Sequence, residues 1–361
     1  MVSKRQGIIA VIVVIVLVAA GLIVVTGSNN KNVTNNGPEY VIDAMDRNIT
    51  TNFTPVRIVS ASPTITELVY ALGAGDKLVA VTDYCDYPAD VVARKANSSL
   101  ASIGGFYTPN FEKVANATPD LVLLDFSVQK DKDMMPQLDS LGIKYVVMFE
   151  GTNTTEVYKN IELAGGVLHE SQNAQNMITS MQQRFASIVT SIGVQASKPK
   201  VMVAVYYDQS SMWIDGGQTF IDDIITGAGG INAFANVSGF QDVNREAALA
   251  ADPDFILITA TMNSQTPQEV YDMMMNDTLM KDTKAVQQHH VYVLINQAEN
   301  SFLHEGIREV QATQILAEIM FPGTFNITIP HIISDEYLGY LPSNWNANTT
   351  AAHVVMETNV W

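Results

Sequence analysis

Cysteine is almost missing from this sequence, which has 361 residues and a single cysteine, Cys85. One thiol cannot form an internal disulfide, so such a cross-link does not stabilise the chain. Positive charge is scarce as well, because 20 Lys and Arg residues stand against 37 Asp and Glu residues and leave a net charge of −17. Binding to nucleic acid needs basic patches that displace counterions, so this balance argues against a nucleic-acid partner.

The sequence also lacks the nucleophile–base–acid arrangement of an enzyme. Cys85 has no neighbouring histidine to activate its thiol. His289 and His290 are adjacent, so in a strand they point to opposite faces and do not share a metal easily. The "GAGG" at residues 227–230 is not followed by the Lys-Ser/Thr of a phosphate-binding loop. We therefore expect no enzyme, no catalytic residues, no cofactor and no metal site.

An apolar run near the N-terminus has the length of a membrane span. Residues 8–25 are 18 consecutive apolar residues, and Lys4 and Arg5 precede them. About 20 apolar residues in a helix cross a bilayer, and a positive flank stays in the cytoplasm. We expect residues 1–27 to be a retained anchor in the cell membrane, with the rest of the chain extracytoplasmic. The alternative is a signal peptide cleaved near residues 18–20, where small residues resemble a cleavage site.

The segment after this run is polar and rich in asparagine. Residues 28–55 are expected to form a flexible linker that holds the globular part away from the membrane. Asn-x-Ser/Thr sequons on a translocated chain indicate a glycoprotein, although this Asn-rich and Thr-rich composition also produces sequons by chance. The sequons begin at Asn32, Asn48, Asn52, Asn97, Asn116, Asn153, Asn236, Asn276, Asn326 and Asn348.

Apolar runs alternate with helical patterns through most of the remaining chain. Nearly continuous apolar runs of this kind indicate parallel sheets that are covered on both faces. Apolar residues at spacings of three and four predict one long helix in the middle of the chain. We expect an α/β fold with two Rossmann-like lobes of mainly parallel sheet. The predicted parts are a first lobe at 56–165, a connecting helix at 166–198, a second lobe at 199–325 and a tail at 326–361.

One sequence unit occurs twice. "NFEKVANATPDLVLLD" begins at Asn110, and "VNREAALAADPDFILITA" begins at Val243. Aligned on Glu112 and Glu246, both copies read Glu, six residues, Pro-Asp and an apolar run. Each copy predicts a helix that starts near the Glu, a turn and a buried strand. The repeat therefore marks equivalent positions in two similarly built lobes.

Several motifs resemble those of class III solute-binding proteins of ABC importers, and most closely the vitamin B12 (cobalamin) branch. They are "RIVSASPTITELVYALGAGDKLVAVTDYCDYPADV" from Arg57, "GGFYTPNFEKVANATPDLVLLD" from Gly104 and "WIDGGQTFIDDIITGAGGINAF" from Trp213. The resemblance implies two lobes joined by one rigid helix, with a ligand bound in the cleft between them. It also implies a permease dimer with ATPase subunits as partner.

The resemblance gives the repeated acids a possible role. In this family each lobe presents a carboxylate to an Arg-rich surface of one permease subunit, and Glu112 and Glu246 match those positions. A symmetric partner favours the same contact on both lobes. The alternative is that each acid only offsets the dipole of its helix.

The expected ligand-binding residues are mostly aromatic, because aromatic rings can cover the apolar face of a corrin. They are Tyr84, Phe106, Tyr107, Tyr207, Trp213, Phe240 and His304. Asp125 departs from the pattern, since the cobalamin binders have a large aromatic there. The expected function is extracytoplasmic capture of cobalamin or a related corrinoid for import. The alternatives are an iron-siderophore or haem binding protein of the same class, or a surface sensor or adhesion module without a transporter.

Overall fold

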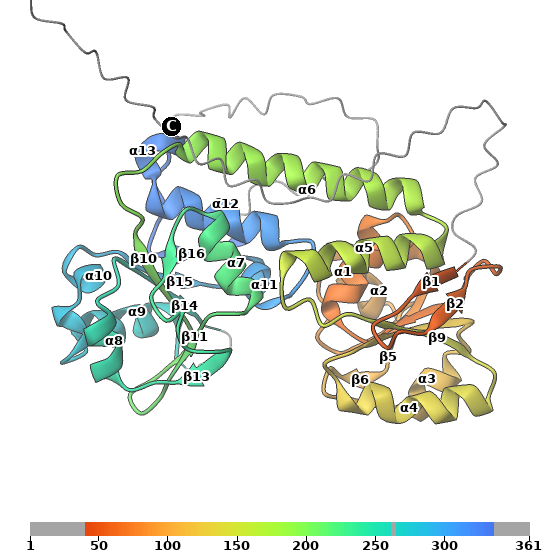
Figure 1. Ribbon diagram of the computed structural model, residues 1–361. Helices are drawn as coiled ribbons and strands as arrows, with labels where there is room; N and C mark the ends of the chain where they lie inside the picture. Colours follow the sequence, from red (N-terminus) through yellow and green to blue (C-terminus); the bar gives the residue numbers. More distant parts are fainter. Residues whose placement is uncertain (1–39, 261–264, 336–361) are drawn as a thin grey trace, which may run out of the picture. The chain divides into compact units, whose positions relative to one another are not determined.

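The computed structural model describes residues 40–260 and 265–335, in which two β-sheets are each covered by helices (Figure 1). This arrangement confirms the predicted α/β class with mainly parallel sheets. Within those two ranges no helix is both long and apolar enough to cross a membrane. The anchor predicted for residues 1–27 lies outside the described residues and stays a prediction.

The first lobe contains five parallel strands in the order β5-β4-β3-β8-β9. Strands β3 and β8 are buried over their whole length, as their continuous apolar runs predict. The strands are β3 (Ile58–Ser60), β4 (Leu78–Val81), β5 (Ala101–Ser102), β8 (Leu121–Asp125) and β9 (Lys144–Met148), with a separate hairpin of β6 (Gly104–Gly105) and β7 (Thr108–Pro109). The helices are α1 (Pro63–Ala71), α2 (Ala89–Ala96), α3 (Phe111–Asn116), α4 (Gln129–Ser140) and α5 (Thr154–Leu168), with a 3-10 turn at Gly75–Lys77.

The second lobe has a seven-stranded sheet in the order β13-β11-β10-β14-β15-β16, with β12 also beside β10. Its pairs are parallel except those of β11 and β13, which are antiparallel and which the apolar runs did not predict. The strands are β10 (Lys200–Tyr207), β11 (Met212–Asp215), β12 (Ile231–Asn232), β13 (Phe240–Asp242), β14 (Phe255–Thr259), β15 (Val291–Leu294) and β16 (Ile332–Ile333). The helices are α7 (Phe220–Gly227), α8 (Arg245–Ala251), α9 (Pro267–Asn276), α10 (Lys284–Gln287), α11 (Asn296–Leu303), α12 (Glu309–Met320) and α13 (Pro322–Phe325), with a 3-10 turn at Met280–Asp282.

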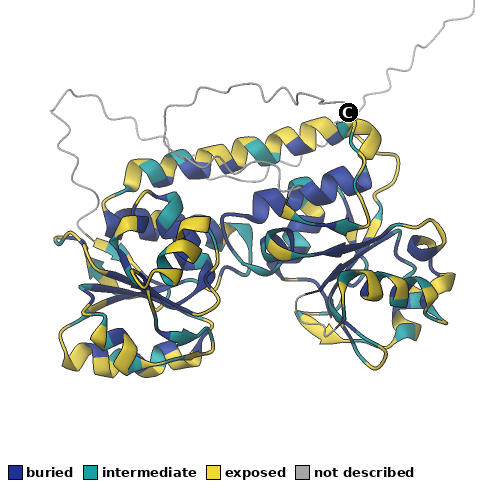
Figure 2. Cartoon of the chain, turned by 180° about the vertical axis from the view of Figure 1, so that it is seen from behind, coloured by how far each residue is buried: buried dark blue, intermediate teal, exposed yellow. Residues whose placement is uncertain are grey.

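One helix, α6 (Ser171–Ile192), contributes to the cores of both lobes. Met177 and Met181 pack into the core of the first lobe, whereas Ile188 and Ile192 pack into that of the second. Its opposite face is exposed, and α5 and α12 lie beneath it (Figure 2). The helix is shorter than the predicted 166–198, because α5 extends to Leu168 and is closed by His169 in the left-handed conformation before α6 begins at Ser171.

The repeated unit has the same structure in both lobes. Asn110 and Asn244 cap α3 and α8 by accepting the backbone N–H of the third helical residue, which satisfies a free donor. The aspartate of each Pro-Asp turn then accepts the backbone N–H at the start of the neighbouring strand, Asp120 from Arg57 at 3.0 Å and Asp254 from Lys200 at 2.8 Å. The repeat therefore ties each helix–strand unit to the parallel strand beside it.

Two predicted irregular segments contain sheet structure. Residues 40–55 belong to the predicted linker, but β1 (Tyr40–Ile42) and β2 (Asn48–Thr50) form a hairpin there. The buried Asp43 accepts the backbone N–H of Val147 at 3.1 Å and fixes this hairpin to β9. In the predicted tail, β16 extends the second sheet beside β15. The predicted linker and tail thus contain sheet structure at these residues, because strands of two or three residues give no apolar run long enough to detect in the sequence.

Candidate ligand-binding site

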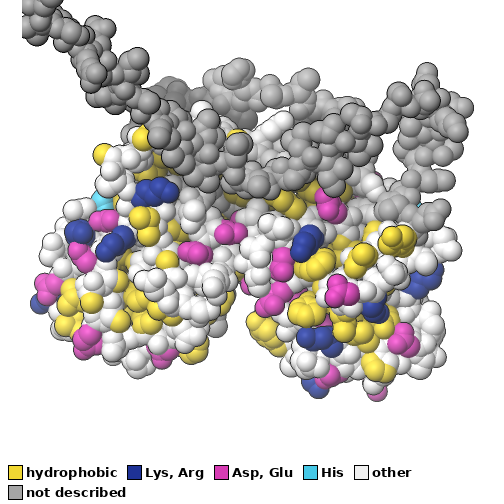
Figure 3. Space-filling model, in the orientation of Figure 1, with side chains coloured by type: hydrophobic (Ala, Val, Ile, Leu, Met, Phe, Trp, Pro, Cys, Tyr) yellow, Lys and Arg dark blue, Asp and Glu magenta, His cyan; other side chains and the backbone are white. Residues whose placement is uncertain are grey.

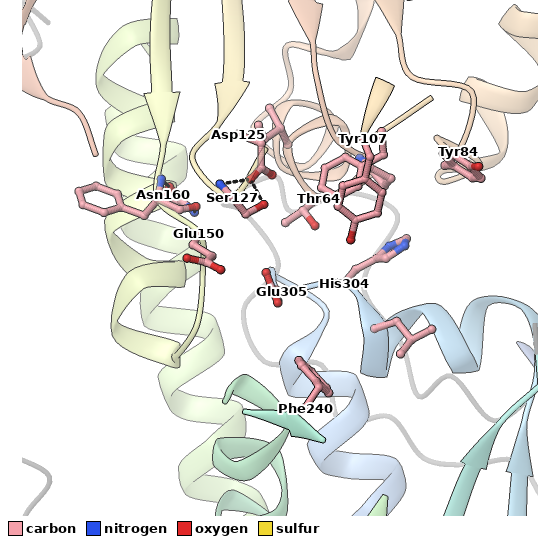
Figure 4. A pocket seen from close by; sticks show the side chains of 15 residues that line it. Thr64, Tyr84, Tyr107, Asp125, Ser127, Glu150, Asn160, Phe240, His304 and Glu305 are labelled. Atoms are coloured by element: carbon pink, nitrogen blue, oxygen red, sulfur yellow. Dashed lines mark hydrogen bonds between the residues drawn. The ribbon is translucent and has the colours of Figure 1, made fainter. Parts of the chain in front are cut away.

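A cavity of about 570 Å³ lies at the carboxyl ends of the first sheet and receives side chains from both lobes (Figure 4). Tyr84 follows β4, Asp125 ends β8, and Glu150 follows β9, so three strand ends place their side chains at one edge. Phe240 and Glu305 enter from the second lobe. The volume lies within the range of small-molecule pockets, which is roughly 300–1,000 Å³.

The start of α1 forms part of the wall. Pro63 occupies the first turn, where its missing N–H costs nothing, and the hydroxyl of Ser62 accepts the N–H of Ile65 at 3.2 Å. This cap fixes the helix start, so that Pro63, Thr64 and Ile65 line the cavity. The strand–Ser-Pro–helix motif of the sequence is thus a wall of the site.

Aromatic rings surround the opening. Tyr84 and Tyr107 are 66% and 72% exposed beside the cavity, so their rings are accessible to a ligand. The Phe106 and Tyr107 rings meet edge to face with centres 4.6 Å apart. Phe240 supplies a ring from the second lobe and is half-exposed. These four predicted aromatics therefore line one cavity.

The position of Phe240 depends on glycines at the end of β11. Gly216 donates its N–H to the carbonyl of Gly239, and Gly239 donates to that of Gly217 at 3.1 Å. A Cβ at Gly216 would lie 2.2 Å from the carbonyl oxygen of Val237, so a larger residue would push this strand away. The "DGG" of the sequence thus allows the close backbone approach that brings Phe240 to the cavity.

Two predicted aromatics do not reach the cavity. Tyr207 is fully buried in the second lobe, where its hydroxyl donates to Asp277 at 3.0 Å. Burial and the charge of Asp277 raise its pKa. Trp213 is 44% exposed on β11 but does not line the cavity. The predicted ligand contact of Tyr207 is corrected, because β10 runs on into a hairpin with β11 and keeps this side chain in the core.

Three acidic side chains, Asp125, Glu150 and Glu305, line the cavity. The sequence indicated only Asp125, as a departure from the aromatic pattern. Glu150 could have been found from its place just after a strand. Glu305 could not, because it lies in the loop between α11 and α12 of the other lobe. On the face shown in Figure 3, acidic side chains also occur near the boundary of the two lobes.

The pKa values of these acids lie above their usual range. Burial raises the pKa of Asp125, although Ser127 donates both its backbone N–H at 3.0 Å and its hydroxyl at 2.6 Å to the carboxylate. Burial, followed by the charges of Asp125 and Glu150, raises the pKa of Glu305 to about 8. Burial and the charge of Asp125 also raise that of Glu150. The cavity therefore resists further negative charge.

The acids do not form a metal centre. No three His, Cys, Asp or Glu side chains within the described ranges are close enough together to hold a metal ion. No Lys or Arg is among the described residues that line the cavity. A ligand entering this cavity thus meets aromatic rings, carboxyl groups, hydroxyl groups and the amide of Asn160.

His304 lines the cavity as predicted, but its ring is already engaged. Its Nδ1 lies 3.0 Å from Oε1 of Glu67 on α1. Arg308 approaches the same oxygen at 3.7 Å, and its guanidinium stacks 4.5 Å from the centre of the Tyr87 ring. Glu67 and Arg308 are only 3% and 1% exposed, so this is a buried ionic contact between the first lobe and the α11–α12 region.

The two acids of the repeated unit lie apart from the cavity. Glu112 and Glu246 are each exposed in the first turn of a short helix, α3 and α8. Neither lines the cavity. Their predicted role in docking stays a prediction.

Comparison with known proteins agrees with the fold and the motifs. The model of the family described as "Periplasmic binding protein" matches residues 58–298. The chain belongs to this family. It is a solute-binding protein of the class that the sequence motifs indicate.

Curated relatives match more than half of the chain. An uncharacterised ABC transporter substrate-binding lipoprotein of Bacillus subtilis is 27% identical over 290 residues, which cover 80% of this chain and 87% of the relative. The vitamin B12-binding protein of Photorhabdus laumondii is 30% identical over 206 residues, which cover 57% of this chain and 71% of the relative.

Solved structures share the fold. A periplasmic haem-binding protein of Vibrio cholerae has a TM-score of 0.64 at 21% identity and covers 74% of this chain and 99% of its own. A possible iron-binding protein of Staphylococcus epidermidis has a TM-score of 0.64 at 21% identity and covers 74% and 100%. At such identity these likenesses concern the fold alone.

Proposed function

We propose that this protein is the extracytoplasmic solute-binding component of an ABC importer and that it captures cobalamin or a related corrinoid in the cavity between its lobes. The observation that carries the proposal is the single cavity in which Tyr84, Phe106 and Tyr107 of the first lobe lie with Phe240 of the second. The relatives named vitamin B12-binding proteins, together with the Ser-Pro and "TDYCDYP" motifs, support the corrinoid over other ligands of this family.

The chemistry of the cavity suits this ligand. A corrinoid has a flat apolar face, which exposed aromatic rings can cover, and a rim of carboxamides that donate and accept hydrogen bonds. Thr64, Ser127 and Asn160 offer hydroxyl and amide groups for that rim. A cavity of about 570 Å³ would hold part of so large a ligand, and the rest would extend into the opening.

Delivery would involve Glu112 and Glu246. We propose that these exposed acids contact a permease with two equivalent subunits, one acid on each lobe. We further propose that residues 1–27 hold the domain at the outer face of the cell membrane. N-terminal sequencing of the protein from native membranes tests this anchor, because a mature terminus near Gly21 would identify a cleaved signal.

Calorimetric titration of the full-length chain in detergent tests the ligand. We expect corrinoid binding with a dissociation constant of about 1 μM or lower, equivalent to about −8 kcal/mol. Replacing Phe240 by Ala should weaken binding, whereas replacing Trp213 by Ala should not, because only Phe240 lines the cavity. If titration with corrinoids releases or absorbs no heat of binding, while haem or a ferric siderophore binds tightly, the proposed ligand is wrong.

A further inference from the structure

The cavity carries three carboxyl groups from three separate elements. Asp125 ends β8, Glu150 follows β9, and Glu305 comes from the loop before α12. In Figure 4 their side chains face the same space, with Glu150 and Glu305 near each other and Asp125 beside Ser127, to which it is hydrogen-bonded. Both lobes thus contribute acids to one cavity. We therefore ask which kind of ligand these acids would favour.

These acids have few partners of their own. Asp125 accepts two hydrogen bonds from Ser127. Glu150 and Glu305 have no hydrogen bond or salt bridge with any of the residues that the structure describes. The charge of Lys132 acts on Asp125 and Glu150, but its ammonium lies 4.5 Å from the centre of the Phe126 ring and does not line the cavity.

The fold does not require this arrangement. Grouping like charges in a half-buried space raises their pKa values and costs stability, and acids perturbed in this way inside a cavity are candidates for a functional role. Each acid either holds a proton, and can then donate a hydrogen bond, or carries a negative charge, and can then accept one or attract a cation. When these acids are ionised, they repel a ligand that brings its own carboxylate or phenolate oxygens to this wall, and they favour hydrogen-bond donors and cations instead.

We infer that Asp125, Glu150 and Glu305 determine the charge class of the ligand: the cavity takes a neutral or cationic molecule that is rich in hydrogen-bond donors and rejects anionic metal chelates. The inference rests on the proposed function only in that binding occurs at this cavity. On this inference the cavity accepts corrinoids and cationic hydroxamate chelates, which carry amide N–H donors. It rejects haemin, which carries propionates, and ferric catecholates, which have a high negative charge.

The test compares ligand pairs that differ mainly in charge. Cationic aquocobalamin and neutral cyanocobalamin form one pair, and a cationic ferric hydroxamate and an anionic ferric catecholate form the other. Haemin is a further anionic probe. Binding to the full-length chain is measured by quenching of its intrinsic fluorescence at low and high salt, because screening weakens a charge preference. The variants are Glu150→Gln, Glu305→Gln and both together.

We expect the wild-type chain to bind aquocobalamin at least tenfold more tightly than cyanocobalamin at low salt. The double variant should lose most of this preference and should bind haemin or the ferric catecholate more tightly than the wild type does. The matched control is Glu162→Gln, which removes an exposed acid from α5 that does not line the cavity. It should keep the wild-type preference, and thermal unfolding of each variant checks that the fold is intact.

The outcomes distinguish this inference from the proposed function. Corrinoid binding without any charge preference, or with a preference that the double variant keeps, overturns the inference and leaves the proposed function standing. Binding of the cationic hydroxamate but of no corrinoid, with the preference lost in the double variant, upholds the inference and rejects the corrinoid. Tight binding of haemin or the catecholate by the wild type, or binding of no probe at all, contradicts both.

Discussion

Glu67 and Glu305 lie on either side of His304, and their surroundings differ sharply. Glu67 is 3% exposed, and its carboxylate lies 3.0 Å from Nδ1 of His304 and 3.7 Å from the guanidinium of Arg308. Glu305 is adjacent to His304 in the chain but faces the acids Asp125 and Glu150. The fold places the cationic Arg308 beside Glu67. The charged groups that act on Glu305, in contrast, are other acids.

The difference distinguishes an acid that is paired within the fold, Glu67, from an acid that is available to a ligand, Glu305. A buried ion with a well-placed partner is costly to break, although it adds little compared with an apolar pair. A half-buried acid without a partner has a raised pKa and costs stability. Removing one partner of the Glu67 contact should therefore destabilise the fold, whereas the acids Asp125, Glu150 and Glu305 line the cavity. Three predictions sharpen this comparison.

The largest effect is expected for Arg308→Met. Arg308 is almost completely buried and also donates to the side chain of Gln297 at 2.6 Å and to its carbonyl at 2.5 Å. Its removal leaves Glu67 as a buried carboxylate with only His304 beside it. We expect the free energy of unfolding, measured in urea, to fall by about 3–5 kcal/mol.

The control for this prediction is the double variant Arg308→Met, Glu67→Gln. Glu67→Gln removes the buried carboxylate that Arg308→Met leaves without its arginine partner. The double variant should therefore be more stable than the sum of the two single changes predicts. A loss below about 1 kcal/mol in Arg308→Met would contradict the view that this pair is structural.

Glu305→Gln is expected to have a smaller effect, and to increase the free energy of unfolding at alkaline pH instead of decreasing it. The pKa of Glu305 is about 8 in the fold against an ordinary value of 4.5, so the folded chain holds a proton that the unfolded chain releases over this range. The free energy of unfolding of the wild type should therefore fall as the pH rises from about 4.5 to 8. We expect the variant to lose less stability over this range, by about 1 kcal/mol or more.

Urea unfolding of both proteins at pH 5 and pH 8 measures this difference. Asp125 and Glu309 also have raised pKa values and give the wild type a slope of the same sign. The comparison between wild type and variant isolates Glu305 because the other acids are present in both. Equal slopes would show that Glu305 is as well solvated in the fold as in the unfolded chain.

The sequence predicted what depends on local pattern. Continuous apolar runs located the parallel strands β8 and β14, and the Glu–Pro-Asp repeat identified the equivalent units around Glu112 and Glu246. Aromatics placed after strand ends, such as Tyr84, proved to line the cavity. Each of these features is encoded within some twenty neighbouring residues.

Features that depend on distant partners were missed. The hairpin at residues 40–50 is short and polar, and its fixation comes from Asp43 bonding to Val147, about a hundred positions away. The exposed strand β13 has no apolar run, yet it pairs with β11 and brings Phe240 to the cavity. Tyr207 does end a strand, β10, but a hairpin to β11 follows at once and its side chain is buried in the core of the second lobe.

The smallest effect on the folded protein is expected for the exposed acids of the repeat, which form no ion pair with any residue that the structure describes. Replacing Glu112 and Glu246 together by Gln keeps the shape and removes two surface charges. The free energy of unfolding should change by at most about 0.5 kcal/mol, as for ordinary surface positions. Corrinoid affinity should not change either, because neither side chain lines the cavity.

Transport should nevertheless fall, because each acid is proposed to meet an arginine of one permease subunit in a charge-assisted contact. Replacement of both by Lys should be worse than replacement by Gln, since like charges would then face each other. Uptake by the importer reconstituted in vesicles measures this, with Glu162→Gln as an exposed acid outside the repeat. If uptake survives the double Lys change, the acids serve only their helix dipoles. The presence of a glutamate at both positions would then result from the similar structure of the two lobes and not from binding to a permease.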